Sequence, residues 1–135
     1  MEHFFHLSET RLCKAIFPGL LNANNSLFGG QAMQWMDEVA YISATRFTHQ
    51  RMFTLNTDNI KFLKAVPENS IIEVIGVVKK ADAVRLTIQV DIYAEDMYSA
   101  ERFKAITGSF IMVSLNSQNK PQRIDYSYVD SLQLA

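Results

Sequence analysis

The sequence predicts a single α+β domain in which one antiparallel β-sheet wraps around one long helix. Two observations lead to this prediction. The helical pattern from residue 31 to about 48 is apolar on nearly every side, which is typical of a helix covered by the rest of a domain. Everything after Arg51 instead has the pattern of strands that follow one another with short turns between them. Consecutive strands joined by short turns pair in antiparallel fashion, so a sheet around the helix is the simplest architecture.

Length and composition indicate one domain and exclude several classes of protein. The 135 residues match the size of one domain, and without linkers or repeats we expect residues 1–135 to fold as one unit, with a C-terminal tail at 116–135. Hydrophobic residues make up 48% and charged residues 20%, which argues against disorder and indicates burial against another subunit. The net charge of -1 argues against nucleic acid as a partner.

The expected location is the cytoplasm, without membrane insertion. No apolar run approaches the roughly 18 residues that a spanning helix needs. The first six residues carry one acid and two histidines, unlike a signal peptide. The single cysteine, Cys13, excludes an internal disulfide and a multi-cysteine metal site, and His3 and His6 lack companion ligands, so no metal is expected.

The elements follow in the order strand, loop, helix and four strands. Residues 2–17 are assigned to a first strand, and the turn formers at 18–26 predict a loop of about ten residues. Gly29 and Gly30 precede the helix, whose first three turns carry only four polar side chains, those of Gln34, Asp37, Glu38 and Tyr41. The four later strands are predicted at 53–66, 71–80, 84–92 and 103–115, and the third of them alternates apolar and polar residues throughout.

Two segments resemble the hotdog-fold acyl-CoA thioesterases. The run NANNSLFGG at 22–30, followed by Met36 and Asp37, is similar to the loop and central helix of that family, and TLNTDNIKFLK at 54–64 is similar to its next strand. The likeness is to the small bacterial hydrolases of the YciA type and the eukaryotic cytosolic enzymes, over roughly residues 10–115. It implies a hotdog fold, thioester hydrolysis and CoA as part of the substrate, with no permanent cofactor.

The chain departs from the family pattern at three places. Asn25 stands where the family usually has glycine, and asparagine is the next best residue for a left-handed backbone, so we expect the turn to form. Ala65 replaces a frequent proline, and the hairpin at 81–84 lacks the small hydroxyl residues that are common there.

The resemblance and the chemistry together make Asp37, Asn24, Gly29 and Gly30 the candidate catalytic residues. A carboxylate on an apolar helix needs a partner, water or a function, and Asp37 is a candidate general base or nucleophile. Gly29 and Gly30 expose N–H groups at the positive end of the helix, where an oxyanion is stabilised. Asn24 is able to orient water or the thioester carbonyl. Each of these residues also has an ordinary explanation. The carboxylate of the aspartate is satisfied by a neighbouring hydrogen bond, the two glycines allow a tight turn into the helix, and the asparagine is a turn residue or a helix cap.

The spacing of these residues predicts a homodimer with shared active sites. Gly29 and Asp37 are eight residues apart, about 12 Å along a helix. One carbonyl group cannot reach both, because the reaction needs contacts of about 3 to 3.5 Å. Two antiparallel helices related by a two-fold axis would bring Asp37 of one subunit beside Gly29 and Asn24 of the other. The resemblance further implies assembly of dimers into tetramers or hexamers.

Other polar residues are candidates for binding the acyl-CoA substrate. Tyr41, one turn after Asp37, is a candidate contact of the acyl chain or of the reacting water, and three lysines are candidates for the CoA phosphates. Two polar residues of the strand at 53–66 are candidates for the pantetheine channel, and a serine in a small-residue stretch of the last strand lies where a ligand is able to approach. The substrate-binding candidates are Tyr41, Asn56, Asp58, Lys64, Lys79, Lys80 and Ser109. The ordinary alternatives are core packing for the tyrosine, pairing within the sheet for the polar strand residues, and exposure to solvent for the lysines.

Two other functions compete with hydrolysis. A non-catalytic acyl-CoA sensor would use the same groove, but Asn24 and Asp37 argue against it. A dehydratase or hydratase generally needs a histidine paired with an acid, and no histidine lies in the predicted loop or helix. The acyl chain length, and the choice between Asp37 as base and as nucleophile, stay open at this point.

Overall fold

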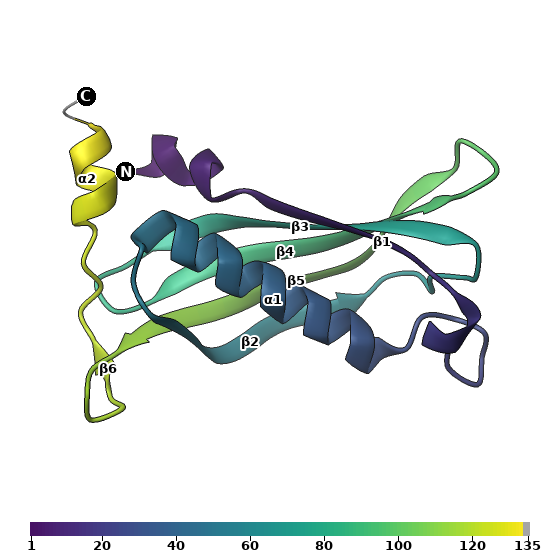
Figure 1. Cartoon of the computed structure of the whole chain (residues 1–135), viewed down its shortest axis with the longest axis horizontal. Coiled ribbons are helices and arrows are strands. Elements are labelled where there is room, and N and C mark those ends of the chain that lie inside the picture. Colours follow the sequence, from purple (N-terminus) through teal and green to yellow (C-terminus); the bar gives the residue numbers. More distant parts are fainter. Residues whose placement is uncertain (134–135) are drawn as a thin grey trace.

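The computed structural model describes residues 1–133 and has one curled sheet with a long helix across one face (Figure 1). Its elements are η1 (Glu2–Ser8), β1 (Thr10–Ala15), η2 (Pro18–Leu20), α1 (Gly29–Thr48), β2 (Met52–Phe62), β3 (Ser70–Ala81), β4 (Leu86–Asp96), β5 (Arg102–Leu115), β6 (Pro121–Gln122) and α2 (Ser127–Leu132). The strand order is β1-β3-β4-β5-β2, with β6 beside β5, and every pairing is antiparallel. The predicted α+β architecture is confirmed.

The N-terminal segment differs from the prediction of one strand over 2–17. Its first part is the 3-10 helix η1, and β1 occupies only Thr10–Ala15. Ser8 provides the physical reason, because its hydroxyl donates to the Phe5 carbonyl at 2.6 Å and accepts from the backbone N–H of Val78 at 2.8 Å. This side chain takes the place of a neighbouring strand at the end of β3, so the chain before it turns away from the sheet.

Other boundaries also differ from the sequence prediction. β2 ends at Phe62 rather than at 66, because the N–H groups of Leu63 and Lys64 both donate to the Ala105 carbonyl, at 2.8 and 3.2 Å. β4 spans Leu86–Asp96 rather than 84–92. The expected tail contains β6 and α2, and its buried Val129 packs into the core, while 134–135 lie outside the described residues.

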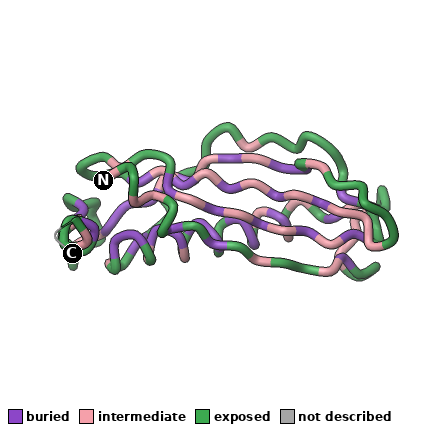
Figure 2. The backbone as a smooth tube through the Cα atoms, turned by 90° about the horizontal axis from the view of Figure 1, so that it is seen from above, coloured by how far each residue is buried: buried purple, intermediate pink, exposed green. Residues whose placement is uncertain are grey.

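α1 covers the inner face of the sheet. Its buried side chains pack against the alternating buried residues of the central strands, which Figure 2 shows as rows of buried and intermediate positions. At Gly76 of β3 an added Cβ would stand 2.6 Å from a Val39 methyl group, so glycine allows the close approach of helix and strand.

One stripe of α1 lies uncovered within the protomer, so the expectation of a helix covered all round is wrong there. The four predicted polar interruptions, three or four positions apart, share this stripe and are all exposed: Gln34, Asp37, Glu38 and Tyr41. The strand that follows α1 in the chain is β2, which lies at one edge of the sheet, with β1 at the other. Of the eleven residues of β2 only Met52 is buried. Within residues 1–133 no helix has both the length and the apolar character for crossing a membrane.

Candidate functional site

Asp37 is tied to the edge strand by a hydrogen bond. Thr54 Oγ1 donates to Asp37 Oδ1 at 2.6 Å and lies 3.4 Å from the sulfur of Met112. Thr54 is directly opposite the buried Met112 in the β2–β5 ladder, so both side chains face the helix side of the sheet. The bond fixes one carboxylate oxygen of Asp37 and leaves Oδ2 available to a ligand. Thr54 is not among the site residues predicted from the sequence, because its position facing α1 depends on the pairing of β2 with β5.

The loop before α1 is organised by Asn22. Its Oδ1 accepts from the backbone N–H groups of Asn24 and Ser26, at 2.8 and 3.2 Å, and from the Ser26 hydroxyl at 3.3 Å. These donors fix the orientation of the amide, and its Nδ2 donates to no group among residues 1–133. Asn25 has φ 60, as predicted for the residue that replaces the family's glycine. Asn24 itself is exposed in this loop.

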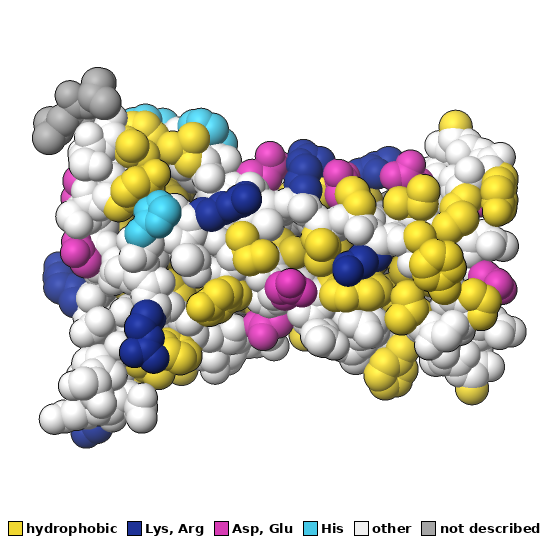
Figure 3. Space-filling model, viewed as in Figure 1, with side chains coloured by type: hydrophobic (Ala, Val, Ile, Leu, Met, Phe, Trp, Pro, Cys, Tyr) yellow, Lys and Arg dark blue, Asp and Glu magenta, His cyan; other side chains and the backbone are white. Residues whose placement is uncertain are grey.

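A pocket of about 320 Å³ lies beside the beginning of α1. Asn22 and Gly29 line it from the loop and the helix, and Phe62 and Lys64 line it from the end of β2. No side chain among residues 1–133 caps the helix, so the N–H groups of Gly29 and Gly30 are left to a ligand. Figure 3 shows exposed hydrophobic side chains toward this end of α1. The pocket therefore combines apolar walls with donors for a developing negative charge.

Asp37 does not line this pocket, because it lies about 12 Å further along α1. The hydrogen-bond donors and the carboxylate are thus separate features of one protomer. Tyr41 is 49% exposed and lies on the same stripe as Asp37, one turn further along the helix.

The other substrate-binding candidates lie on the outer face of the sheet or at its end. Lys79 and Ser109 line a shallow pocket of about 290 Å³ with Lys61. Asn56 and Asp58 point to the same outer face, because they lie opposite Ile111 and Ser109, which alternate with helix-facing residues. At the β3–β4 hairpin Lys80 pairs with Asp82 at 3.7 Å. Of these lysines only Lys64 borders the pocket beside Gly29.

Two side chains that do not line the pocket beside Gly29 have shifted pKa values. On the outer face Arg102 and Arg11 lie 2.7 and 3.1 Å from Glu73, and the hydrogen bond from Arg102 is the main reason that the pKa of Glu73 is lowered. Burial raises the pKa of Tyr126 to about 12, and its hydroxyl donates to the Asp82 carbonyl at 2.6 Å. Within residues 1–133 no three His, Cys, Asp or Glu side chains are placed to hold a metal ion.

Relatives in sequence point to one family. The family model described as thioesterase superfamily matches residues 24–101. A Bacillus subtilis protein named as an acyl-CoA thioester hydrolase, YkhA, is 31% identical over 84% of this chain and 70% of its own length. The acyl-CoA thioester hydrolase YciA of Salmonella typhimurium is 27% identical over 78% of this chain and 81% of its own length.

Solved structures agree with the sequence relatives. An acyl-CoA hydrolase from Bacillus cereus superposes with a TM-score of 0.84 at 26% identity, over 96% of this chain and 83% of that one. The fold is also that of a Staphylococcus aureus acyl-CoA hydrolase solved with butyryl-CoA, CoA and CoA disulfide, with a TM-score of 0.82 at 24% identity over 90% and 74% of the two chains. The sheet curled around α1 is thus a hotdog fold, and the chain belongs to the thioesterase superfamily.

Proposed function

We propose that this protein hydrolyses acyl-CoA thioesters to a carboxylic acid and CoA. The observation that carries the proposal is the carboxylate of Asp37, held by Thr54 on the uncovered stripe of α1 with Oδ2 available. The names of the relatives support the substrate class, since YkhA and YciA are both described as acyl-CoA thioester hydrolases. A cytosolic acyl-CoA hydrolase of mouse, 28% identical, supports a cytoplasmic location.

Residue spacing supports three members of the site. The Staphylococcus aureus hydrolase was solved with alanine in place of an aspartate, of a threonine 17 positions later, and of an asparagine 15 positions before that aspartate. Asp37, Thr54 and Asn22 have these same spacings in this chain, whereas Asn24 lies two positions too near. We therefore assign to Asn22 the role that sequence reasoning gave to Asn24, and its free Nδ2 beside Gly29 suits that role.

In the proposed reaction Asp37 activates the attack on the thioester. As a general base, it takes a proton from water, whose oxygen then bonds to the carbonyl carbon. The carbonyl oxygen becomes an oxyanion that accepts hydrogen bonds from Gly29, Gly30 and Asn22 of the partner subunit. When the C–S bond breaks, the CoA thiolate takes the electron pair and receives the proton. The alternative is direct attack by Asp37, which forms a mixed anhydride that water then hydrolyses.

A second copy of the chain is required for this geometry, and β2 is the proposed contact. An eleven-residue edge strand offers unpaired backbone groups, and Phe53 and Leu55 are 36% and 43% exposed on it. Pairing of two such edges would set the α1 helices antiparallel and create two equal sites. Further assembly is supported by a hexameric thioesterase of Yersinia pestis, which has a TM-score of 0.76 at 25% identity.

Among the substrate contacts, we assign the CoA phosphates to Lys64, because it lines the pocket beside Gly29. Tyr41 is the proposed contact of the acyl chain. CoA enters only as part of the substrate, and we propose no resident cofactor. Five further predictions have no support from the pocket beside Gly29: Asn56, Asp58, Lys79, Lys80 and Ser109.

The test is thiol release from acyl-CoAs of increasing chain length by the wild type and by D37N, N22A and N24A. We expect kcat to fall at least about hundredfold in D37N and about tenfold or more in N22A, with the oligomer intact, because each loses a group that acts in the transition state. N24A is the matched control and should stay within about threefold. Tight acyl-CoA binding without turnover at any length would favour the sensor. Full activity in D37N would show that another residue activates the attack on the thioester.

A further inference from the structure

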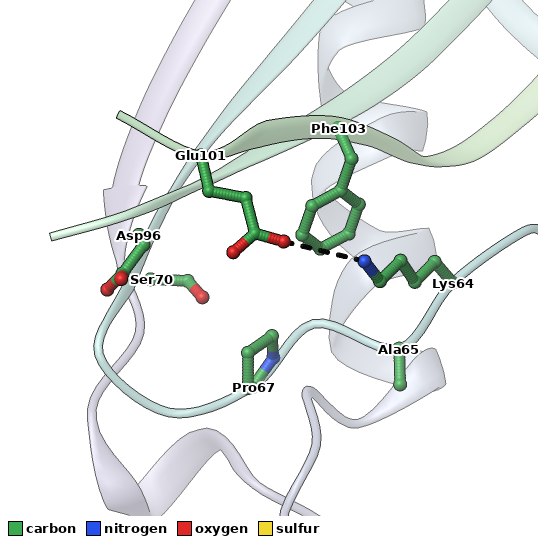
Figure 4. A pocket seen from close by; sticks show the side chains of 7 residues that line it. All are labelled: Lys64, Ala65, Pro67, Ser70, Asp96, Glu101 and Phe103. Carbon is green, nitrogen blue, oxygen red and sulfur yellow. Dashed lines mark ion pairs between the residues drawn. The ribbon is translucent and has the colours of Figure 1, made fainter. Parts of the chain in front are cut away.

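Lys64 stands between two pockets. It lines the pocket beside Gly29 and also a neighbouring one of about 250 Å³, which Figure 4 shows from close by. Its ammonium lies 3.6 Å from Glu101 Oε1 and 4.3 Å from the centre of the Phe103 ring, and both of these side chains belong to the second pocket. In the unliganded protein the cation of the proposed substrate site is therefore already engaged by a carboxylate and an aromatic face.

We propose that Glu101 competes with the phosphate groups of CoA for the Lys64 ammonium, and so sets how tightly the enzyme holds acyl-CoA and released CoA. The inference rests on the proposed function, because acyl-CoA must be the ligand. An ammonium binds phosphate through charge-assisted hydrogen bonds, and CoA carries several phosphate charges against the single charge of Glu101. CoA is therefore able to displace the carboxylate, but only after the existing ion pair is broken.

The surroundings of Lys64 allow this exchange. Its side chain and that of Glu101 are 59% and 63% exposed, and ion pairs between such exposed groups are weak. The backbone N–H groups of Leu63 and Lys64 both donate to Ala105, so the main chain is anchored while the flexible side chain is able to turn. Phe103 gives the ammonium a defined resting position through a cation–π contact.

A second carboxylate in the same pocket provides a matched control. Asp96 lines the pocket together with Glu101, but it forms no ion pair with Lys64 within residues 1–133, and its Oδ1 instead accepts from the N–H of Tyr98 at 3.3 Å. Removing either carboxylate takes one negative charge from the lining of the pocket. Only the removal of Glu101 releases the lysine.

The first experiment compares E101Q and D96N with acyl-CoA and with the matching acyl-pantetheine, which lacks phosphates. For E101Q we expect a two- to fivefold lower KM for acyl-CoA and a matching fall in the Kd of CoA by calorimetry, at unchanged kcat. D96N should leave both constants at the wild-type value. Neither variant should change the KM for acyl-pantetheine. An unchanged KM for acyl-CoA in E101Q, or an equal gain in D96N, would overturn the inference.

The second experiment is a double-mutant cycle with K64M, which removes the ammonium and keeps an apolar stem. We expect K64M to bind CoA more weakly and E101Q to have no further effect in that background. A gain from E101Q that persists without Lys64 would mean that Glu101 acts by general repulsion, against the proposal. Absence of turnover with acyl-pantetheine and acyl-CoA alike in the wild type would count against hydrolysis itself, and the CoA calorimetry would still test the competition.

Discussion

Strands β2 and β4 each have eleven residues and belong to the same sheet, but their surroundings are opposite. β4 lies between β3 and β5, and every second residue from Leu86 to Ala94 is buried under α1. β2 has a neighbour on one side only, and ten of its eleven residues are partly or fully exposed. Two register shifts interrupt its pairing with β5, whereas β4 pairs with β5 through one.

The two strands meet different requirements, β4 those of a stable core and β2 those of the proposed site. On β4 an apolar residue at every second position is required by packing alone. On β2 the residue in the corresponding inward position near the middle of α1 is Thr54, whose hydroxyl bonds to Asp37. The proposed chemistry therefore lies where the protomer by itself is incomplete, and β2 is suited to a partner and a substrate rather than to a core.

The largest effect should come from placing a charge on β2. We expect L55K to separate the dimer into monomers and to lower kcat/KM about hundredfold or more, because Asp37 then loses the donors of the partner subunit. Analytical ultracentrifugation and thiol release measure the two effects. The control is V84K at the β3–β4 hairpin, where the side chain is 40% exposed, similar to the 43% of Leu55. A fully active dimer of L55K would show that β2 is not the contact.

An intermediate effect should come from shortening a side chain on β4. Ile92 is completely buried, and I92A should lower the free energy of unfolding by about 2 to 5 kcal/mol through lost burial and the cavity left behind. Urea unfolding measures the change, with T57A on exposed β2 as the comparison at about 0.5 kcal/mol or less. Equal losses in the two variants would erase the contrast between the strands.

The smallest effect should come from the charges on the outer face. The pKa of Glu73 lies below its ordinary 4.5 chiefly because of Arg102, so the carboxylate adds stability above that pH, and the contribution is lost as the pH falls through the lowered pKa. We expect E73Q to cost about 1 kcal/mol or less at pH 7 and to flatten the loss of stability in acid. Urea unfolding at pH 7 and pH 3 measures this, with E68Q as control. If E73Q lost as much unfolding free energy between pH 7 and pH 3 as the wild type, Glu73 would not contribute to the acid sensitivity.

The sequence alone predicted the regular elements best. The prediction for α1 began within two residues of its start and ended at Thr48, because the apolar pattern and the two glycines mark a helix locally. It failed for Glu2–Ser8, where the conformation depends on a hydrogen bond between Ser8 and a strand about seventy residues later. The two register shifts of β2 could not be predicted either, because they depend on how β2 pairs with β5 and not on the residue pattern of β2 itself.

For the candidate site, the sequence predicted the helix residues but not their partners. Asp37 and the two glycines stand out locally, as a charge in an apolar helix and as a break before it. Thr54 becomes significant only when β2 lies beside α1. Three asparagines occur within four positions of the loop, and only the hydrogen bonds single out Asn22 as the residue around which the others turn.

The hydrogen bond from Val78 to Ser8 also bears on how the sheet is completed during folding. β1 pairs with β3, which follows about sixty residues later in the chain. Until then the edge of β1 stays unpaired, and closing so long a loop slows its addition. The order of β1 therefore depends on contacts that are distant in the chain, whereas the backbone hydrogen bonds of α1 are local to Gly29–Thr48 and form without the sheet.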